Sequence, residues 1–424
     1  MFTHADRCAM VSVSLIVLAL QGCLDSSVPT NNGEIDNDDA DHSTLLATVS
    51  DNVIIPAYAR FAETTAAWSE DNNAISDYCQ VIGESSENTR LATAQQSWRD
   101  AMDEWQQIEA FQIGPITDNS NNLRQRVYSW PDFISTCTID QNVVRAESSL
   151  DFESVARQGR GLDALEYLLF NTDLTHSCPS QITETQDWDA RTENDRKQAR
   201  CQYAELVASD IAASAQTLLN AWQPEGGNYR QTLIDSGSEG GAFDSQTAAL
   251  NALSDSLFYL DDWVKDAKLA LPAGLSASCD STTCPEAMET QYGDHSLATI
   301  KYNLVGFKDI FTGTADEESR NFSFDDLLFT KNFPEISDRV IENVDAALAL
   351  IDEIPVSFSE GIDAIENTAD DSACINAANN PDAASELHLC RLHGHIKRIT
   401  DELKGDFLTV ISLNLPSRVE GDND

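Results

Sequence analysis

The chain has 424 residues, of which 26 are Lys or Arg and 71 are Asp or Glu, so its formal net charge at pH 7 is −45. A surface this acidic repels nucleic acid and anionic lipid and favours cations or cationic partners, so nucleic-acid binding is excluded as a function. Salt adaptation produces the same acidity, and the length allows two domains or one body made of two similar halves.

The first 22 residues have the pattern of a targeting signal. Arg7 precedes an apolar run, Met10–Leu20, that is too short to span a bilayer and is followed by Gln-Gly-Cys23. A small residue directly before Cys resembles the lipobox of bacterial lipoproteins, in which Cys23 would become the lipidated N-terminus. An ordinary secretory signal that contains a Cys is the alternative. Because Leu24 rather than Asp follows Cys23, we expect an outer-membrane lipoprotein that faces the periplasm or the cell surface and touches the membrane through its lipid anchor only.

Residues 23–44 are polar and acidic without any hydrophobic period, which predicts a flexible tether. Beyond them, apolar residues recur at helical spacing. In the first half the pattern predicts helices over about 49–68, 91–108 and 203–222, and the second of these runs toward Gly114-Pro115, a strong helix breaker. In the second half it predicts helices over about 250–271, 297–311, 336–351 and 387–410.

Glycines cluster among polar residues between the two halves, which predicts an interdomain linker over residues 225–241. No stretch alternates apolar and polar residues with β-branched side chains, so strands are not expected. The fold expected is all-α, with two tandem helical bundles over residues 45–224 and 242–415 and an acidic tail over residues 416–424.

Ten cysteines are present, and setting aside Cys8 in the signal and Cys23 leaves eight, an even number in an oxidising compartment. We therefore expect disulfide-stapled loops rather than a Cys-based metal site, because no Cys-x-x-Cys pair occurs. Connectivity does not follow rigorously from sequence. Short loops favour these pairs, the last by elimination: Cys279 with Cys284, Cys374 with Cys390, Cys178 with Cys201, and Cys79 with Cys137.

The stretch from Gly161 to Phe170 places two acids in an otherwise apolar run. On a helix, residues three apart share one face, so Asp163 and Glu166 point the same way. Two carboxylates on a buried face require a partner, which could be a metal ion, an Arg or water.

In its form Gly-x-Asp-x-x-Glu, this stretch resembles the Gly-x-His-x-x-Glu motif of the imelysin family, also called M75 peptidase-like. Three further segments are similar to that family: Trp98–Pro115 with its paired Trp and terminal Gly-Pro, the Trp130-Pro131 pair, and Tyr292–Gly313. The resemblance implies an all-helical envelope protein, often a lipoprotein, associated with iron acquisition and with other iron-uptake proteins of the envelope.

This chain departs from the family motif at Asp163, which stands where the family has His. An Asp and a Glu form an all-oxygen pair that suits hard cations such as iron(III), calcium or magnesium and disfavours zinc. Hydrolysis would need another base, and no His-Glu-x-x-His occurs. The departure therefore favours binding over catalysis.

Glu109, just before Gly114-Pro115, could supply a third carboxylate to Asp163 and Glu166 and complete a hard-cation site. Alternatively, an arginine neutralises these acids in a structural network, since buried acids are usually paired. The candidates are Arg99, Arg124, Arg126 and Arg160.

Two groups of histidines are further candidates. His388, His393 and His395 are more simply explained as surface residues without a role than as a metal site. His295 could supply, from the second bundle, the imidazole that the motif lacks.

The sequence thus favours an imelysin-like envelope lipoprotein that binds a metal or metal-bearing ligand in iron uptake, without robust peptidase activity. Two alternatives stay open. One is an active metallopeptidase of the M75 type, and the other is a polysaccharide- or protein-binding lipoprotein whose carboxylates are purely structural.

Overall fold

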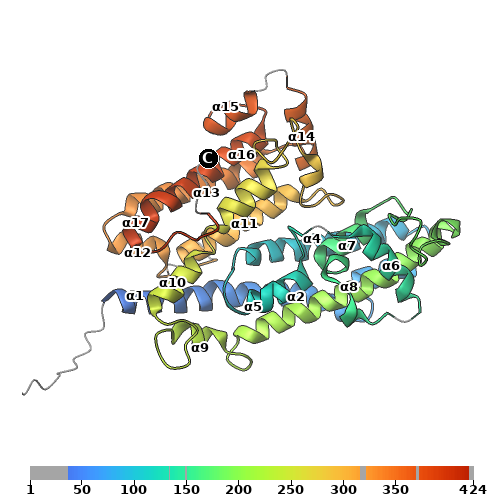
Figure 1. The fold of residues 1–424 in the computed structure, drawn as a ribbon, viewed down its shortest axis with the longest axis horizontal. Coiled ribbons are helices and arrows are strands. Elements are labelled where there is room, and N and C mark those ends of the chain that lie inside the picture. Colours follow the sequence, from blue (N-terminus) through green and yellow to red (C-terminus); the bar gives the residue numbers. More distant parts are fainter. Residues whose placement is uncertain (1–36, 133, 149, 316–320, 369–371, 420–424) are drawn as a thin grey trace, which may run out of the picture. The chain divides into compact units, whose positions relative to one another are not determined.

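A computed structural model describes residues 37–132, 134–148, 150–315, 321–368 and 372–419. These residues are helices and loops with no strand among them, which confirms the all-α prediction (Figure 1). The predicted signal peptide, residues 1–22, and Cys23 lie outside the described residues. From Asn37 onward the chain packs as one compact unit.

The first half is built around two long helices. Its helices are α1 (Asn37–Val49), α2 (Ile55–Ala66), α3 (Ala74–Gln80), α4 (Glu87–Glu109), α5 (Asp118–Val127), α6 (Thr136–Ala146), α7 (Gly161–Phe170) and α8 (Glu193–Trp222). On α4, Ala94, Trp98, Met102 and Trp105 recur every three or four residues and are all fully buried. Helix α8 packs against α2, α5, α6 and α7, so it forms the spine of this bundle (Figure 1).

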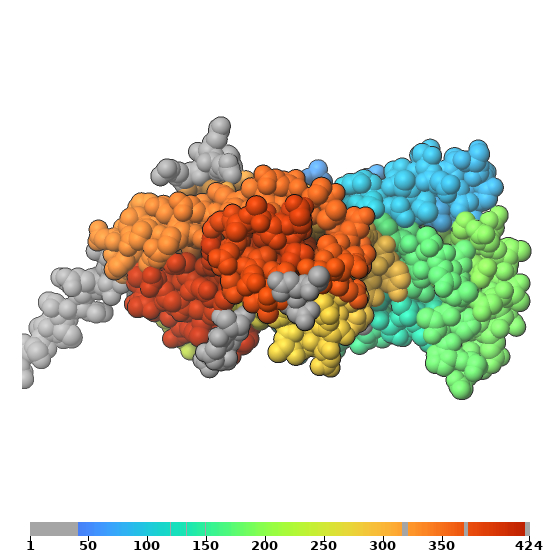
Figure 2. All heavy atoms as spheres, turned by 90° about the horizontal axis from the view of Figure 1, so that it is seen from above, coloured from blue at the N-terminus to red at the C-terminus, as the bar shows by residue number. Residues whose placement is uncertain are grey.

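The second half adds a second group of helices, which packs on the first half through α4 and α1. Its helices are α9 (Tyr229–Ile234), α10 (Gln246–Ser254), α11 (Ser296–Thr312), α12 (Phe324–Thr330), α13 (Pro334–Glu353), α14 (Phe358–Glu366), α15 (Ala373–Asn379), α16 (His388–Glu402) and α17 (Leu408–Ile411). In Figure 2 the orange and red segments of this half occupy a different region from the blue and green segments of the first half. Two tandem bundles are therefore confirmed.

Helix α11 lies directly on α4 because Gly306 allows close approach. A Cβ added at Gly306 would stand 2.2 Å from the carbonyl oxygen of Gln107. This contact brings Asn303, one turn earlier, within hydrogen-bond distance of the Gln106 carbonyl, at 2.7 Å. The two halves are thus locked together beside the end of α4.

Three predicted boundaries need correction. The tether predicted over residues 23–44 overlaps α1, which begins at Asn37 and packs on α9 and α10 through a buried face that includes Leu45 and Leu46. The linker predicted over residues 225–241 contains α9 with a buried Leu233. The tail predicted over residues 416–424 packs at its start, where Val419 is buried, and its last five residues lie outside the described part. Local composition suggested loops, whereas contacts with distant helices order these segments.

The predicted helix over 250–271 is interrupted. Helix α10 ends at Ser254, turns follow, and Leu260–Ala270 is a π-helical segment. Such segments are rare and are often found at functional sites. This one carries two buried lysines, Lys265 and Lys268.

Four disulfides are present, and two of the predicted pairings are wrong. Cys279–Cys284 and Cys374–Cys390 form as predicted, but the first half contains Cys79–Cys201 and Cys137–Cys178. The pairing by short sequence distance failed because α3 packs against α8, which brings the Cα atoms of Cys79 and Cys201 to 5.6 Å across 122 residues of sequence.

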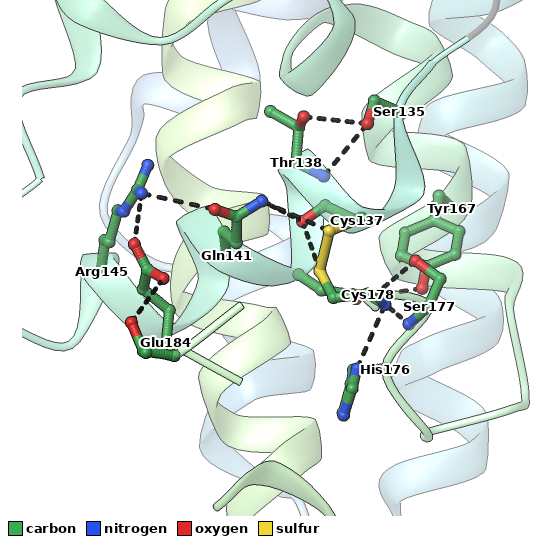
Figure 3. Close-up of a disulfide and its surroundings, with 12 residues drawn as sticks. Ser135, Cys137, Thr138, Gln141, Arg145, Tyr167, His176, Ser177, Cys178 and Glu184 are labelled. Carbon is green, nitrogen blue, oxygen red and sulfur yellow. Dashed lines mark hydrogen bonds and ion pairs between the residues drawn. A yellow bond between two sulfur atoms is a disulfide. The ribbon is translucent and has the colours of Figure 1, made fainter. Parts of the chain in front are cut away.

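The Cys137–Cys178 disulfide fastens the loop after α7 to α6 (Figure 3). The neighbouring Ser177 then donates from its backbone N–H and its hydroxyl to Asp140 Oδ2, at 2.8 and 2.9 Å. Tyr167 donates to the other oxygen of Asp140 at 3.0 Å. The disulfide thereby helps to fix Tyr167, the residue directly after the motif glutamate.

None of the described helices combines the length and the apolar character needed to cross a membrane.

Candidate functional site

Helix α7 begins at Gly161 in a conformation that requires glycine. Its φ is +87°, and an added Cβ would stand 2.9 Å from both the Val127 carbonyl oxygen and the Asp163 carboxylate. The glycine therefore lets the helix start immediately against the end of α5. As a result, Asp163 and Glu166 enter the interior on one face, with only 8% and 3% of their surfaces exposed.

The Asp163 carboxylate accepts hydrogen bonds only from uncharged donors. Oδ2 accepts from the backbone N–H of Ser129 at 3.2 Å and from the Ser129 hydroxyl, and Oδ1 accepts from the N–H of Ala164 at 3.0 Å. Burial raises the pKa of Asp163 to about 7, and these hydrogen bonds oppose the rise. The group therefore changes protonation near neutral pH.

Glu166 connects the motif to the second half. Its Oε1 accepts from the backbone N–H groups of Tyr292 and Gly293, at 2.8 and 2.7 Å. No donor among the described residues reaches Oε2. Burial raises the pKa of Glu166 to about 8, the two backbone hydrogen bonds lower it, and the charges of Asp163 and Glu289 raise it further.

These two acids line a pocket of about 120 Å³ at the junction of the two halves. Its walls include four acids, of which Asp132 is exposed, and three aromatic rings: Asp132, Asp163, Glu166, Glu289, Tyr128, Trp130 and Tyr292. A larger cavity of about 590 Å³ lies among α11, α12 and α13, and Asp309 is one of its acids. The smaller pocket is the candidate site because the motif acids open into it.

Glu109 does not join the two motif acids, contrary to the predicted arrangement. It is fully buried, and it pairs with Arg124 at 2.9 Å and with Lys268 at 2.7 Å. Its carboxylate is therefore neutralised by two cations. For Glu109, the alternative of a structural arginine pair is correct.

The other candidate arginines pair elsewhere. Arg126 and Arg160 both contact Asp210, at 2.8 and 2.5 Å, and Arg99 lies over the ring of Phe170. Hence no Arg or Lys of the described residues forms an ion pair with Asp163 or Glu166.

Lys268 is the centre of the network behind the pocket. Its ammonium group donates to Gln106, Glu109 and Asn303 at 2.6 to 2.8 Å and pairs with Glu289 at 2.9 Å. The sequence carried a signal for this residue, since Lys268 stands on the apolar stripe four residues after Val264 and three before Leu271.

Glu289 is the other buried acid of the pocket, and sequence reasoning missed it. Tyr128 donates to its Oε1 at 2.9 Å and Thr299 to its Oε2 at 2.5 Å. Burial raises the pKa of Glu289, and the nearby Lys268 opposes the rise. Glu289 lies in an irregular segment after the Cys279–Cys284 loop, where no periodicity marks a buried residue.

The described side chains around the pocket do not form a site for a bare metal ion. Within the part of the chain that the structure describes, no three His, Cys, Asp or Glu side chains are grouped to hold a metal ion. The Glu109 carboxylate forms ion pairs with Arg124 and Lys268. Three of the four carboxylate oxygens of Asp163 and Glu166 already accept hydrogen bonds. Coordination of a bare ion by three protein ligands does not fit these residues.

The histidines lie outside the pocket. His295 faces the first half, but its Nε2 lies 2.7 Å from Asp103 Oδ1 and its ring packs on Trp98, so it does not replace the missing imidazole. His393 and His395 are buried, which corrects their prediction as surface residues.

Gly114 serves packing rather than the pocket. Its φ is +73°, and an added Cβ would stand 2.3 Å from the ring of Tyr229. The Gly114-Pro115 pair therefore seats the chain after α4 against α9.

Comparisons with known proteins agree with this fold. The imelysin (peptidase M75) family model matches residues 54–385. A curated relative, "Iron-regulated protein A" of Synechococcus elongatus, is 25% identical over 265 residues, which is 62% of each chain, so the match spans less than two thirds of that relative.

Two crystal structures have the same fold. An iron-regulated protein A precursor from Parabacteroides distasonis has a TM-score of 0.58 at 18% identity, covering 86% of this chain and 95% of its own. An imelysin-like protein from Psychrobacter arcticum has a TM-score of 0.60 at 17% identity, and the match covers 89% of this chain and 97% of that protein. Together with the Gly-x-Asp-x-x-Glu helix, the family match over most of the chain shows that this protein belongs to the imelysin family.

Proposed function

We propose that this protein is an envelope lipoprotein that binds a cationic, metal-bearing ligand in iron uptake, without robust peptidase activity. The pocket at Asp163 and Glu166 is the binding site. The name of the Synechococcus relative and the lipobox around Cys23 support the iron-related role and the envelope location.

One observation carries this proposal. Every other buried carboxylate of the described residues has a Lys or Arg within 4 Å: Glu109, Asp140, Asp210, Asp261 and Glu289. Asp163 and Glu166 are the exceptions, and they open into a pocket. Buried carboxylates are normally paired with a cation. Without one, burial raises the pKa of Asp163 to about 7 and that of Glu166 to about 8, so a cationic ligand would take the place of the protons that these groups hold.

The ligand is proposed to carry its metal rather than to be a bare ion, because the donor set does not fit three-ligand coordination. The full-length protein in detergent should bind a soluble iron(III) chelate in equilibrium dialysis. The double variant Asp163→Asn with Glu166→Gln should lose at least tenfold in affinity. Asp309→Asn is the matched control, since burial also raises its pKa to about 7 but it lies in the other cavity. Equal losses in both variants would contradict the proposal.

Peptidase activity is the second candidate, because carboxyl groups that titrate near neutral pH suit acid–base catalysis. Incubation with an unfolded protein substrate, with and without a chelator, separates the two. Chelator-sensitive cleavage that disappears in Glu166→Ala would establish the peptidase and overturn the binding proposal.

The envelope location has its own test. Labelling with a radioactive fatty acid in a bacterial host should mark the wild-type chain and not Cys23→Ser. Retention of label in the variant would refute lipidation at Cys23.

A further inference from the structure

The chemistry around the pocket suggests which part of a ligand enters it. The charge that the pocket lacks is positive, since Asp163 and Glu166 have no cationic partner among the described residues. However, only one of their four carboxylate oxygens, Glu166 Oε2, accepts no hydrogen bond. Even with Asp132 at the pocket wall, no three acids of the described residues are grouped to hold a metal ion, whereas one free oxygen is sufficient for one charge-assisted N–H···O bond.

The protein holds an ammonium group of its own behind the same wall. The Lys268 ammonium is fully buried, is held by Glu109, Glu289 and two side-chain amide oxygens, and lies 4.9 Å from the centroid of the Trp130 ring. Carboxylates and an indole face together stabilise an ammonium ion. Glu289 and Trp130 also line the pocket, so Lys268 shows that these walls accommodate this chemistry.

The aromatic lining extends around the pocket. Tyr128, Trp130 and Tyr292 provide ring surface, and the half-buried Tyr292 is fixed by an edge contact with Tyr167 at 5.2 Å. Such rings contact alkyl carbons and attract cations, whereas they offer little to a hydrated metal ion.

The size of the pocket limits the group that enters. A volume of about 120 Å³ is well below the roughly 300–1,000 Å³ of pockets that enclose a drug-sized ligand. The pocket therefore suits a small arm of the ligand, such as an unbranched alkylamine, rather than a whole chelate.

We infer that the pocket binds its ligand through a primary alkylammonium arm, with Glu166 Oε2 accepting from the ammonium group and the aromatic walls contacting the alkyl chain. This inference rests on the proposed function and specifies it: the metal stays outside the pocket, on the chelating part of the ligand.

Isothermal titration calorimetry on the full-length protein in detergent tests the inference with n-butylamine hydrochloride at pH 9. This pH lies above the pKa of about 8 of Glu166 and below the pKa of an alkylammonium group, about 10.4. We expect saturable binding of butylammonium and none of 1-butanol, which has the same shape without the charge. Glu166→Gln should weaken butylammonium binding at least tenfold, while its amide oxygen can still accept from Tyr292 and Gly293. Asp309→Asn should leave binding unchanged.

A second variant keeps the test decisive if Glu166→Gln does not fold. Tyr292→Leu removes one aromatic wall and retains the backbone N–H that Glu166 uses, so it should weaken butylammonium binding several-fold. Unchanged affinity in Tyr292→Leu would overturn the role of the aromatic walls.

Calcium chloride and the iron(III) chelate distinguish failure of this inference from failure of the proposed function. If the chelate binds in a Glu166-dependent manner and butylammonium neither binds nor competes, the alkylammonium inference is refuted while the proposed function stands. Tight, Glu166-dependent binding of calcium without butylammonium binding would refute both, because the proposed function requires a metal-bearing ligand and not a bare ion. If none of the three probes binds, both are refuted.

Discussion

Replacing Lys268 by methionine should destabilise the protein strongly, and more so as the pH rises. The ammonium group of Lys268 lies between Glu109 and Glu289, all three of which are fully buried. Methionine has a similar volume, so the cavity it leaves is small. Arg124 continues to neutralise Glu109, and the loss therefore falls on Glu289.

The size of the effect follows from the two states open to Glu289. Leaving it ionised and unpaired costs about 3–5 kcal/mol, as for other broken buried pairs. It can instead take up a proton, which at pH 7 costs about 3.4 kcal/mol because the ordinary pKa of the group is 4.5. At pH 5 the same proton costs only about 0.7 kcal/mol. The destabilisation should thus be about 3 kcal/mol at pH 7 and about 2–3 kcal/mol smaller at pH 5.

Urea unfolding of wild type and variant at both pH values measures this difference. Lys301→Met is the matched control, since Lys301 pairs with Asp352 on the surface and its loss should cost less than about 1 kcal/mol. Adding Glu289→Gln to Lys268→Met should restore part of the stability. The reasoning is wrong if Lys268→Met loses no more stability than Lys301→Met, or if the stability that it loses does not increase with pH.

Three further changes test other parts of the structure. Gly161→Ala and Gly240→Ala both place alanine at φ +87°, but only at Gly161 would the added Cβ meet backbone atoms. In thermal unfolding, Gly161→Ala should therefore lose at least about 1 kcal/mol more stability than Gly240→Ala. Equal losses of stability in the two variants would contradict the close packing of α7. Burial raises the pKa of Asp163 from 3.8 to about 7, so the wild type loses stability as the pH rises through this interval. With chelator present, the free energy of unfolding of Asp163→Asn relative to that of the wild type should therefore increase by up to about 4 kcal/mol between pH 4 and 7. A difference that does not depend on pH would show that Asp163 is not buried as an acid. Peptide mapping without reduction should recover Cys79 linked to Cys201, and a Cys79 peptide linked to Cys137 would refute this pairing. Because the pair closes a loop of 122 residues, removing the disulfide should lower the free energy of urea unfolding by up to about 5 kcal/mol.

The features that the sequence determined are local. Apolar residues three and four apart on Trp98–Trp105 and along residues 203–222 were sufficient to predict buried helices, because a helix places such residues on one face whatever surrounds it. The same spacing placed Asp163 and Glu166 on one buried face. The departure at Asp163 from the family motif was likewise visible in sequence alone.

The partners of these residues were decided by tertiary structure. Glu109 was expected beside the motif acids, but the packing of the π-helical segment places Lys268 against it from 159 residues away. Glu289, 123 residues beyond Glu166, completes the pocket from an irregular segment, and Cys79 pairs with Cys201 rather than Cys137. Periodicity states which face of a helix is buried, but the opposing group depends on how helices far apart in the chain pack, and that information is not local.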